Sequence, residues 1–319
     1  MALLKKINSK AKAYRNSGFG TSPNSYGGRF VNKNGTANVE KRGMHILHRI
    51  SWYHTLIDMS TWKFMVILLT FYVSINFAFA IIYFGIGIEH LNGIDSNSSQ
   101  WVQFGQAYFF SAQTFTTVGY GHISPAGFMA SSVSAIEALI GLLSFAIATG
   151  LFFGRFSKPV AFLKFSHNAV IAPYGKITAL MIRTTPFKNT NFTDAEAKIT
   201  LGMSVEENGI MSNKFYSLDL EFEKINLLTL SWTLVHPITG DSPLYQFTKD
   251  DFDKINGEII VFIKTFDDMF SNTVAIRTSY TFNEIVYGAK FKPMYTRSSD
   301  NSMTILHLDK INDYDISSL

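Results

Sequence analysis

The chain has 319 residues, of which 47% are hydrophobic, 15% aromatic and only 16% charged, whereas ordinary soluble domains carry about a quarter charged residues. This composition is typical of a membrane protein, and the many aromatic residues exclude a largely disordered chain. The sequence contains no cysteine, so disulfide bonds are excluded as well. The formal net charge of +4 says little alone, because the positions of the charges decide which partners they attract.

The chain begins with a basic segment, residues 1–45, and continues with a stretch whose apolar side chains recur at helical spacing. In this stretch, residues 46–60, the apolar face lies opposite His48, Arg49 and Asp58. We interpret it as an amphipathic helix that lies along the membrane surface. A plain extension of the membrane helix that follows is the alternative.

Two apolar blocks are long enough to cross a membrane. Phe64 to Ile88 carries no charged side chain, and Phe128 to Phe153 carries a single one, Glu137. A hydrocarbon core about 30 Å thick requires roughly 20 apolar residues in a helix. We therefore predict membrane spans over about 62–88 and 126–156, in a membrane domain of residues 61–158.

The cations flank these two blocks. Residues 1–63 contain 11 Lys or Arg and two acids, no Lys or Arg occurs from Phe64 to Gly154, and the cations resume at Arg155 and Lys158. Because loops rich in Lys and Arg stay in the cytoplasm, both termini are predicted to be cytoplasmic. A basic segment beside a membrane also attracts anionic lipids.

The connection between the spans contains an apolar run that is too short to cross a bilayer, with a pore helix predicted at about 102–115. TVGYG follows at residues 117–121, the sequence whose backbone carbonyl oxygens replace the hydration shell of K⁺ in potassium channels. Turning successive carbonyls toward one axis requires positive φ at some positions, which glycine tolerates. We predict a K⁺-binding filter here; a chance turn in a loop is the alternative. The filter residues are Thr117, Val118, Gly119, Tyr120 and Gly121.

One chain supplies one such loop, and we find no internal repeat, so the pore is predicted to be a homotetramer. The remaining residues, 159–319, contain alternating stretches such as Leu227–Val235 and Glu258–Thr265, separated by turn clusters, and predict an all-β sandwich. From Arg155 to the end, 17 basic residues stand against 19 acidic ones. This balance gives no indication of a nucleic-acid partner.

Further motifs occur in order along the chain, and together they resemble the inward-rectifier potassium channel family, more closely its prokaryotic branch. The resemblance runs from about Arg29 to Pro293. It implies a cytoplasmic immunoglobulin-like domain that extends the pore inward and K⁺ as the bound ion with no organic cofactor. It also implies a multi-pass protein of a cell membrane, here a bacterial inner membrane. The motifs are RFVNKNG at 29–35, Asn38-Val39, Asp58-Met59, Trp62-Lys63, Gly150, Arg155, Lys158-Pro159, FSHNAVIA at 165–172, Met181 to Arg183, His236 to Ile238, DSPLY at 241–245, and Arg277 to Gly288.

The chain also departs from the family. The family often braces its filter with an acid paired to an Arg, but Gln113 and Ile123 stand at those positions, so the filter needs other support. Phe145 stands where an acid gives strong rectification. The resemblance therefore implies weak rectification and weak block by internal Mg²⁺ or polyamines.

The resemblance also assigns a gate. Phe153 matches the narrowing where inner helices cross, and Phe266 to Ser271 match a cytoplasmic constriction. Glu137 is an intramembrane acid, which is costly enough to expect a role or a partner. We assign it with Phe145 to the candidate cavity; helix packing behind the filter is the alternative.

Basic residues near the inner ends of the spans are candidate ligands of lipid phosphates. An enzyme is not expected, because metal-spaced His or Cys pairs are absent and Gly175-Lys176 lacks the upstream glycine of a phosphate loop. A rival mechanism is a β domain that binds a cytosolic ligand and thereby opens an otherwise general potassium pore. The candidate lipid-binding residues are Arg49, Lys63, Arg155 and Lys158.

Overall fold

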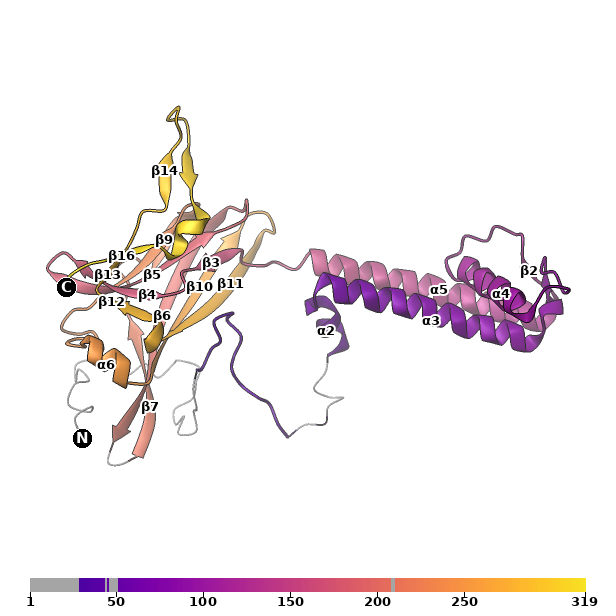
Figure 1. The fold of residues 1–319 in the computed structure, drawn as a ribbon, viewed down its shortest axis with the longest axis horizontal. Helices are drawn as coiled ribbons and strands as arrows, with labels where there is room; N and C mark the ends of the chain where they lie inside the picture. Colours follow the sequence, from indigo (N-terminus) through magenta and orange to yellow (C-terminus); the bar gives the residue numbers. More distant parts are fainter. Residues whose placement is uncertain (1–28, 44, 46–50, 208–209) are drawn as a thin grey trace. The chain divides into compact units, whose positions relative to one another are not determined.

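The structure, a computed structural model, describes residues 29–43, 45, 51–207 and 210–319. It divides into two compact units (Figure 1). The membrane unit runs from Arg42 to Lys158, and the second unit combines the described N-terminal residues up to Lys41 with Pro159–Leu319. Of the predicted interfacial helix at 46–60, residues 46–50 lie outside the described residues.

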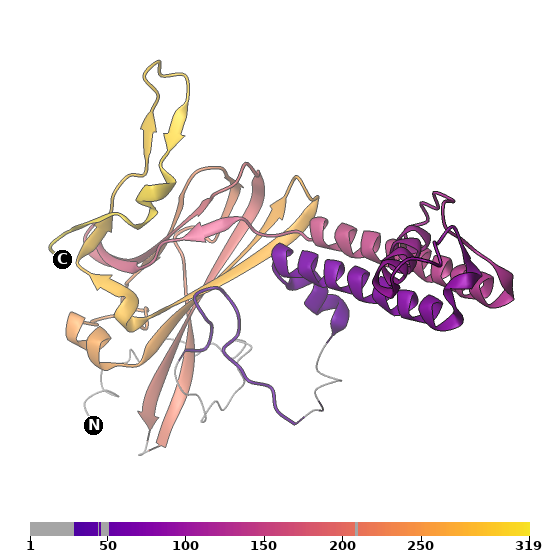
Figure 2. The same cartoon turned by 45° about the vertical axis from the view of Figure 1, so that its right-hand side comes forward.

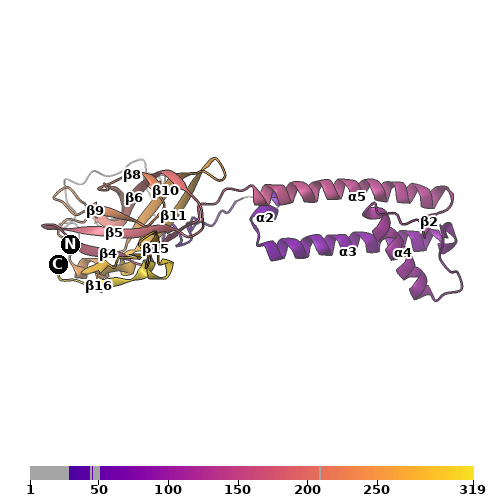
Figure 3. The same ribbon diagram turned by 90° about the horizontal axis from the view of Figure 1, so that it is seen from above.

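The membrane unit is built on two helices that are long and apolar enough to span a membrane. They are α3 (Thr61–Ile86) and α5 (Gly127–Phe156), and they run side by side with the shorter helix α4 beside them (Figure 3). At 1.5 Å per residue, the 26 residues of α3 extend about 39 Å, enough to cross a hydrocarbon core. The other elements are α2 (Trp52–Asp58), η1 (Ile88–His90), β1 (Leu91–Asn92), α4 (Gln100–Phe115) and β2 (Ser124–Pro125).

Both long helices expose large apolar side chains, and each buries one strongly polar side chain. Leu69 and Phe77 are 63% and 50% exposed, whereas Asn76 and Glu137 are fully buried. An exposed apolar surface of this extent is expected to contact lipid or other protein chains. The membrane unit is therefore folded for an apolar environment.

The second unit is a β-sandwich of two five-stranded sheets (Figure 2). One sheet has the order β11-β10-β6-β7, with β8 also paired to β6; the other has the order β12-β4-β5-β3, with β9 also paired to β5. Every pairing within these sheets is antiparallel except that of β12 with β4. The strands are β3 (Leu163–Phe165), β4 (Ala169–Tyr174), β5 (Ile177–Pro186), β6 (Phe192–Glu207), β7 (Ile210–Leu218), β8 (Lys224–Leu228), β9 (Trp232–Pro237), β10 (Gly257–Asp267), β11 (Asn272–Thr281) and β12 (Ile285–Tyr287).

The core of the sandwich lies between the two sheets. Leu180 and Ile182 from β5 pack with Ile199 from β6 and Val261 from β10, and all four side chains are at most 1% exposed. This burial follows from the alternation along each strand, which places every second side chain on the inner face. The remaining elements are α6 (Lys249–Lys254), η2 (Phe282–Glu284), β13 (Ala289–Phe291), β14 (Tyr295–Arg297), β15 (Thr304–Leu306), η3 (Leu308–Asn312) and β16 (Tyr314–Ile316).

The N-terminal motif at residues 29–35 docks onto the sandwich. Arg29 pairs with Glu284 at 2.8 Å, and Glu258 accepts a hydrogen bond from the backbone N–H of Val31 at 3.0 Å. Burial disfavours the charged form of Glu284, but the Thr281 N–H, Arg29 and Lys33 outweigh it and hold the pKa of that carboxyl below its usual range. Residues 29–41 therefore belong to the second unit rather than to a separate segment.

Candidate functional site

The loop from Thr117 to Gly121, the predicted filter loop, follows α4, the predicted pore helix, and is exposed along its whole length. Its backbone φ is positive at every second residue, with values of 60° at Thr117, 54° at Gly119 and 80° at Gly121. The sequence predicts positive φ at the two glycines, and the structure adds Thr117. Such alternation allows successive carbonyl oxygens to face the same side of the loop, as a cage for a dehydrated cation requires.

The start of this loop is fastened to the last turn of α4. The N–H groups of Val118 and Gly119 donate to the carbonyl oxygen of Gln113 at 3.0 and 3.3 Å, and the N–H of Thr117 donates to Thr114 at 3.0 Å. Gln113 therefore supports the loop through its backbone, although its side chain lacks the charge that the family places there. These amides point toward the pore helix, which leaves the carbonyls of the loop for other ligands.

The far end of the loop is held by a small antiparallel pairing of β1 with β2. The chain passes very close to itself here, because a Cβ added at Gly93 would lie 2.1 Å from the carbonyl oxygen of His122. Gly93 also has a φ of 90°, which glycine adopts more easily than other residues. Both ends of the loop are thus fixed by backbone contacts.

Helix α5 passes very close to α4 at Gly141. A Cβ there would lie 2.0 Å from the carbonyl oxygen of Phe115, so only glycine fits without a shift of the backbone. Phe115 is two residues before the filter loop. The contact therefore sets the position of α4, and with it the start of the loop, against α5.

One turn earlier on α5, Glu137 joins a buried polar cluster between the three helices. The hydroxyl of Tyr83 on α3 lies 2.6 Å from Glu137 Oε2, and the hydroxyl of Ser111 on α4 contacts Glu137 Oε1. Ser111 Oγ also lies 3.1 Å from Asn76 Oδ1 on α3. The cluster connects all three helices behind the filter loop.

The positions of Glu137 and Phe145 on α5 differ sharply. Glu137 is fully buried within a single chain, whereas Phe145 is 73% exposed. A fully buried side chain cannot line a cavity formed between copies of the chain. We therefore replace the cavity assignment of Glu137 by its alternative, helix packing behind the filter.

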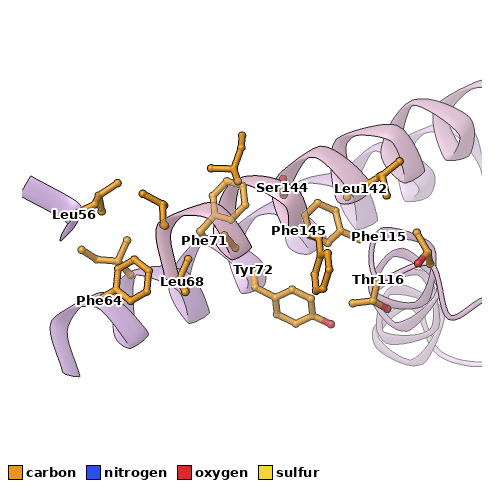
Figure 4. Close-up of a pocket in the computed structure, with 16 residues that line it drawn as sticks. Leu56, Phe64, Leu68, Phe71, Tyr72, Phe115, Thr116, Leu142, Ser144 and Phe145 are labelled. Carbon is orange, nitrogen blue, oxygen red and sulfur yellow. The ribbon is translucent and has the colours of Figure 1, made fainter. Parts of the chain in front are cut away.

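Phe145 borders an apolar groove of about 710 Å³ between α3, α5 and the end of α4. Figure 4 shows its ring directed into this groove, near Tyr72 of α3 and Thr116 at the end of the pore helix. Thr117, the first residue of the filter loop, lines the same space. Phe145 and the filter loop thus face one apolar space below the pore helix.

The two candidate gate regions lie in different units. Phe153 is in the last part of α5 and is 73% exposed. Phe266 lies near the end of β10 and is 37% exposed, and Ser271 lies in the turn before β11 with a φ of 46°. Both places present aromatic side chains to the outside of a single chain.

Arg155 has partners that the sequence did not predict. Its guanidinium donates to the carbonyl oxygens at the end of α2, reaching Leu56 at 2.6 Å, Ile57 at 2.9 Å and Met59 at 2.8 Å. These carbonyls are the acceptors that the end of a helix leaves without partners. Arg155 therefore fastens α2 to α5, and its contact with lipid stays a prediction.

The other three candidate lipid ligands, Lys158, Lys63 and Arg49, differ in the contacts that the structure describes for them. Lys158 pairs with Asp58 of α2, although both side chains are at least half exposed. Lys63 is exposed near the start of α3. Arg49 lies outside the described residues. Among the described candidates, Lys63 and Lys158 are exposed and Arg155 is partly buried.

The sequence did not identify Tyr83 and Ser111 as partners of Glu137, or Asn76 as a partner of Ser111. A signal was available, because Asn76 and Tyr83 are seven residues apart on α3 and so share one face of an otherwise apolar helix. An intramembrane acid requires a partner, and Asn76 and Tyr83 were among the polar side chains on the other span. Ser111 carried no such signal, because its distance from Glu137 depends on how α4 folds back against α5.

Two family models match the chain, one described as an ion channel over residues 64–158 and one as the inward rectifier potassium channel C-terminal domain over residues 163–317. The inward rectifier potassium channel Kirbac3.1 of Paramagnetospirillum magnetotacticum is 30% identical over 277 residues, covering 85% of this chain and 91% of the relative. Proteins called ATP-sensitive inward rectifier potassium channel 12 are 26% identical in Gallus gallus and 25% in Bos taurus, each covering 83% of this chain and 67% of the relative.

Two helices long and apolar enough to span a membrane, the shorter helix α4 with its loop between them, a C-terminal β-sandwich and the ion-channel family match define this protein as a two-span ion channel. The chain belongs to the inward rectifier potassium channel family, in its prokaryotic branch. It is a membrane protein that conducts K⁺, and it is not an enzyme.

Proposed function

We propose that four copies of the chain surround one pore, in which residues Thr117–Gly121 of each copy form a filter that binds K⁺. The alternating positive φ along the loop carries this proposal, because it suits a row of carbonyl oxygens. The exposure of the loop adds support, since one chain alone encloses no ion. Irregular backbone at membrane depth is tolerated only when it is buried in protein or lines a cavity.

The gate in this proposal is formed by Phe153, where four aromatic rings meet and exclude water from the inner end of the pore. The turn from Phe266 to Ser271 forms a second constriction in the β-sandwich domain. Phe145 leaves the cavity without carboxylates, so internal Mg²⁺ and polyamines bind weakly and rectification is weak. Its 73% exposure within a single chain supports a position at the cavity.

The protein is proposed to lie in a bacterial inner membrane with both termini in the cytoplasm. The absence of Lys and Arg between Phe64 and Gly154 supports this orientation. Trp62 and Trp101, which are 77% and 86% exposed, suit the two membrane interfaces. Anionic lipids are expected to contact Lys63 and Arg49. At Lys158, lipid phosphates compete with the carboxylate of Asp58 for the ammonium group.

Rubidium uptake into proteoliposomes tests this function. The purified tetramer is expected to take up Rb⁺ against excess Na⁺, and Phe153→Ala is expected to raise the rate because the narrowing is widened. Comparable Na⁺ and Rb⁺ uptake would contradict the filter assignment. An unchanged rate in Phe153→Ala, together with a raised rate in Phe266→Ala, would move the gate to the β10–β11 turn.

A further inference from the structure

The polar cluster behind the filter contains three contacts between oxygen atoms. Asn76 Oδ1 lies 3.1 Å from Ser111 Oγ, and Ser111 Oγ in turn contacts Glu137 Oε1. Glu137 Oε2 lies 2.6 Å from the hydroxyl of Tyr83. All four side chains are at most 1% exposed. Each contact between two oxygens is a hydrogen bond only if one proton lies between them, so the cluster requires three protons.

The orientation of the Asn76 amide determines how many protons the neutral groups provide. Asn76 Nδ2 donates to the carbonyl oxygen of Tyr72, one turn earlier on α3, at 2.7 Å. The flipped amide would place two carbonyl oxygens at that distance, so Oδ1 is the atom that faces Ser111 and can only accept. Ser111 and Tyr83 supply one hydroxyl proton each. Two protons are therefore available for three contacts.

We propose that Glu137 is protonated in the folded channel and donates the third hydrogen bond, as a positioning residue for the filter. Glu137 Oε1–H donates to Ser111, Ser111 donates to Asn76, and Tyr83 donates to Glu137 Oε2. With a charged carboxylate, one of the three oxygen pairs would have no proton between its members in a buried place. A neutral acid also avoids the cost of a charge at membrane depth.

The protonated carboxyl acts on the filter through the pore helix. Ser111 lies one turn before Phe115 on α4, and Glu137 lies one turn before Gly141 on α5. The hydrogen bond between Ser111 and Glu137 and the close contact of Phe115 with Gly141 therefore hold the same two helix faces together.

The last turn of α4, held in this way, carries Gln113, whose carbonyl binds the first amides of the filter loop. Glu137 thus supplies the support that Gln113 and Ile123 do not give as an ion pair. This inference deepens the proposed function and rests on it, because it takes residues 117–121 as the filter.

Infrared spectroscopy tests the protonation state directly. The spectrum of unmodified tetramer in proteoliposomes at neutral pH is compared with that of Glu137→Gln, with glutamate labelled by ¹³C to mark the glutamate bands. The difference is expected to contain the carbonyl stretch of a protonated carboxylic acid. A carboxylate band in its place would overturn the inference, whatever the flux measurements give.

Flux measurements on the same samples test the positioning role. Gln reproduces the neutral acid, because its amide donates to Ser111 while its carbonyl accepts from Tyr83, so Glu137→Gln is expected to keep the Rb⁺ over Na⁺ uptake ratio. Glu137→Ala and Tyr83→Phe are expected to lower this ratio by about fivefold or more in assembled tetramers. Ser132→Ala is the matched control, since Ser132 donates to the Phe128 carbonyl of its own helix and the described residues show no contact of its side chain with another helix.

The outcomes separate this inference from the proposed function. Unselective flux in the unmodified tetramer would contradict the filter assignment itself. Selective flux in the unmodified tetramer, with Glu137→Gln as defective as Glu137→Ala, would overturn only the role of the protonated acid. If Glu137→Ala does not assemble, Tyr83→Phe tests the positioning role instead. An unchanged Rb⁺ over Na⁺ uptake ratio in Tyr83→Phe would contradict that role.

Discussion

The membrane unit and the β-sandwich domain expose different kinds of side chain, although both have an apolar core. In the membrane unit Leu69 and Phe77 are exposed while Asn76 and Glu137 are fully buried. In the sandwich the core between the sheets is apolar, and charged side chains such as that of Lys198, which is 64% exposed, face outward. The difference follows from the surroundings, because lipid cannot satisfy polar groups and water can.

The two units also differ in how their elements make contact. The sandwich is held by many apolar side chains between two sheets, so the loss of one contact is shared among several neighbours. In the membrane unit a few contacts locate the filter, namely those at Gly141, at Glu137 and at the first amides of the loop. Comparable substitutions are therefore expected to have larger effects in the membrane unit.

The largest effect is expected from Gly119→Ala, which should abolish Rb⁺ uptake. Gly119 has a φ of 54°, and an added Cβ meets nothing within 4 Å, so the backbone conformation alone opposes alanine. That cost is about 1–2 kcal/mol per chain and about 4–8 kcal/mol over four chains. Gly105→Ala within helix α4 is the control, because its Cβ also has open space and no positive φ is involved. Full uptake in Gly119→Ala would contradict the filter conformation.

The next largest effect is expected from Gly→Ala substitutions at closely packed positions, and it differs between the two units. Gly141→Ala places a Cβ 2.0 Å from the backbone oxygen of Phe115, so tetramer yield and selective uptake are expected to be lost. Gly202→Ala in β6 meets ring atoms of Phe215 at 2.9 Å, where the ring can turn at a cost of about 1–3 kcal/mol. Gly85→Ala, with open space around it, serves as the control. Equal losses of tetramer yield and selective uptake in the Gly141→Ala and Gly202→Ala variants would contradict this difference between the two units.

A third prediction concerns charge in the cavity. Phe145→Asp provides four carboxylates on an exposed part of α5, so spermine block should become tighter and steeply voltage dependent, since each charge gains about 2.3 kcal/mol per 100 mV crossed. The unmodified channel is expected to show shallow block by spermine or Mg²⁺. Current against voltage in planar bilayers across a spermine titration measures both. Tight block in the unmodified channel that disappears in Glu137→Gln would show that Glu137 faces the cavity after all.

The smallest effect is expected in the sandwich, from the buried His236. Its Nδ1 lies 2.7 Å from the Asp219 carbonyl and its Nε2 lies 2.8 Å from the Ser242 hydroxyl. Burial lowers the pKa of His236, against the opposing effect of the Asp219 carbonyl. The unfolded chain then binds more protons than the folded one, so stability falls as pH drops through and below about 6.5.

Thermal unfolding of the full chain measures this effect. The loss of stability from neutral to acidic pH is expected to be smaller in His236→Gln, whereas the exposed His167→Gln should behave like the unmodified protein. An identical pH dependence in all three proteins would show that His236 does not report on folding of the sandwich.

Patterns within the sequence predicted the features that depend on local chemistry. The two spans follow from uncharged stretches of sufficient length, and the sandwich follows from alternating strands and turn clusters, and the structure and the family relationship confirm both. Positive φ at Gly119 and Gly121 followed from what a carbonyl cage requires, and the structure has it. The roles of these loop residues in ion binding remain predictions.

Features that depend on how helices fold back could not be predicted in the same way. The sequence showed that Glu137 needs a partner, but Ser111 becomes that partner only when α4 returns beside α5. Arg155 looked like a lipid ligand because it is a cation at the end of a span, yet it contacts the carbonyls of α2, some hundred residues earlier in the chain.

The most direct test of the account is to locate the bound cations. A crystal structure of the tetramer is determined in the presence of Tl⁺, a K⁺ substitute whose anomalous scattering marks its position. The account predicts a row of Tl⁺ peaks on the fourfold axis between the backbone oxygens of residues 117–121, and the loss of this row in Gly119→Ala. Tl⁺ bound elsewhere, with no peaks beside Thr117–Gly121 in the unmodified tetramer, would contradict it.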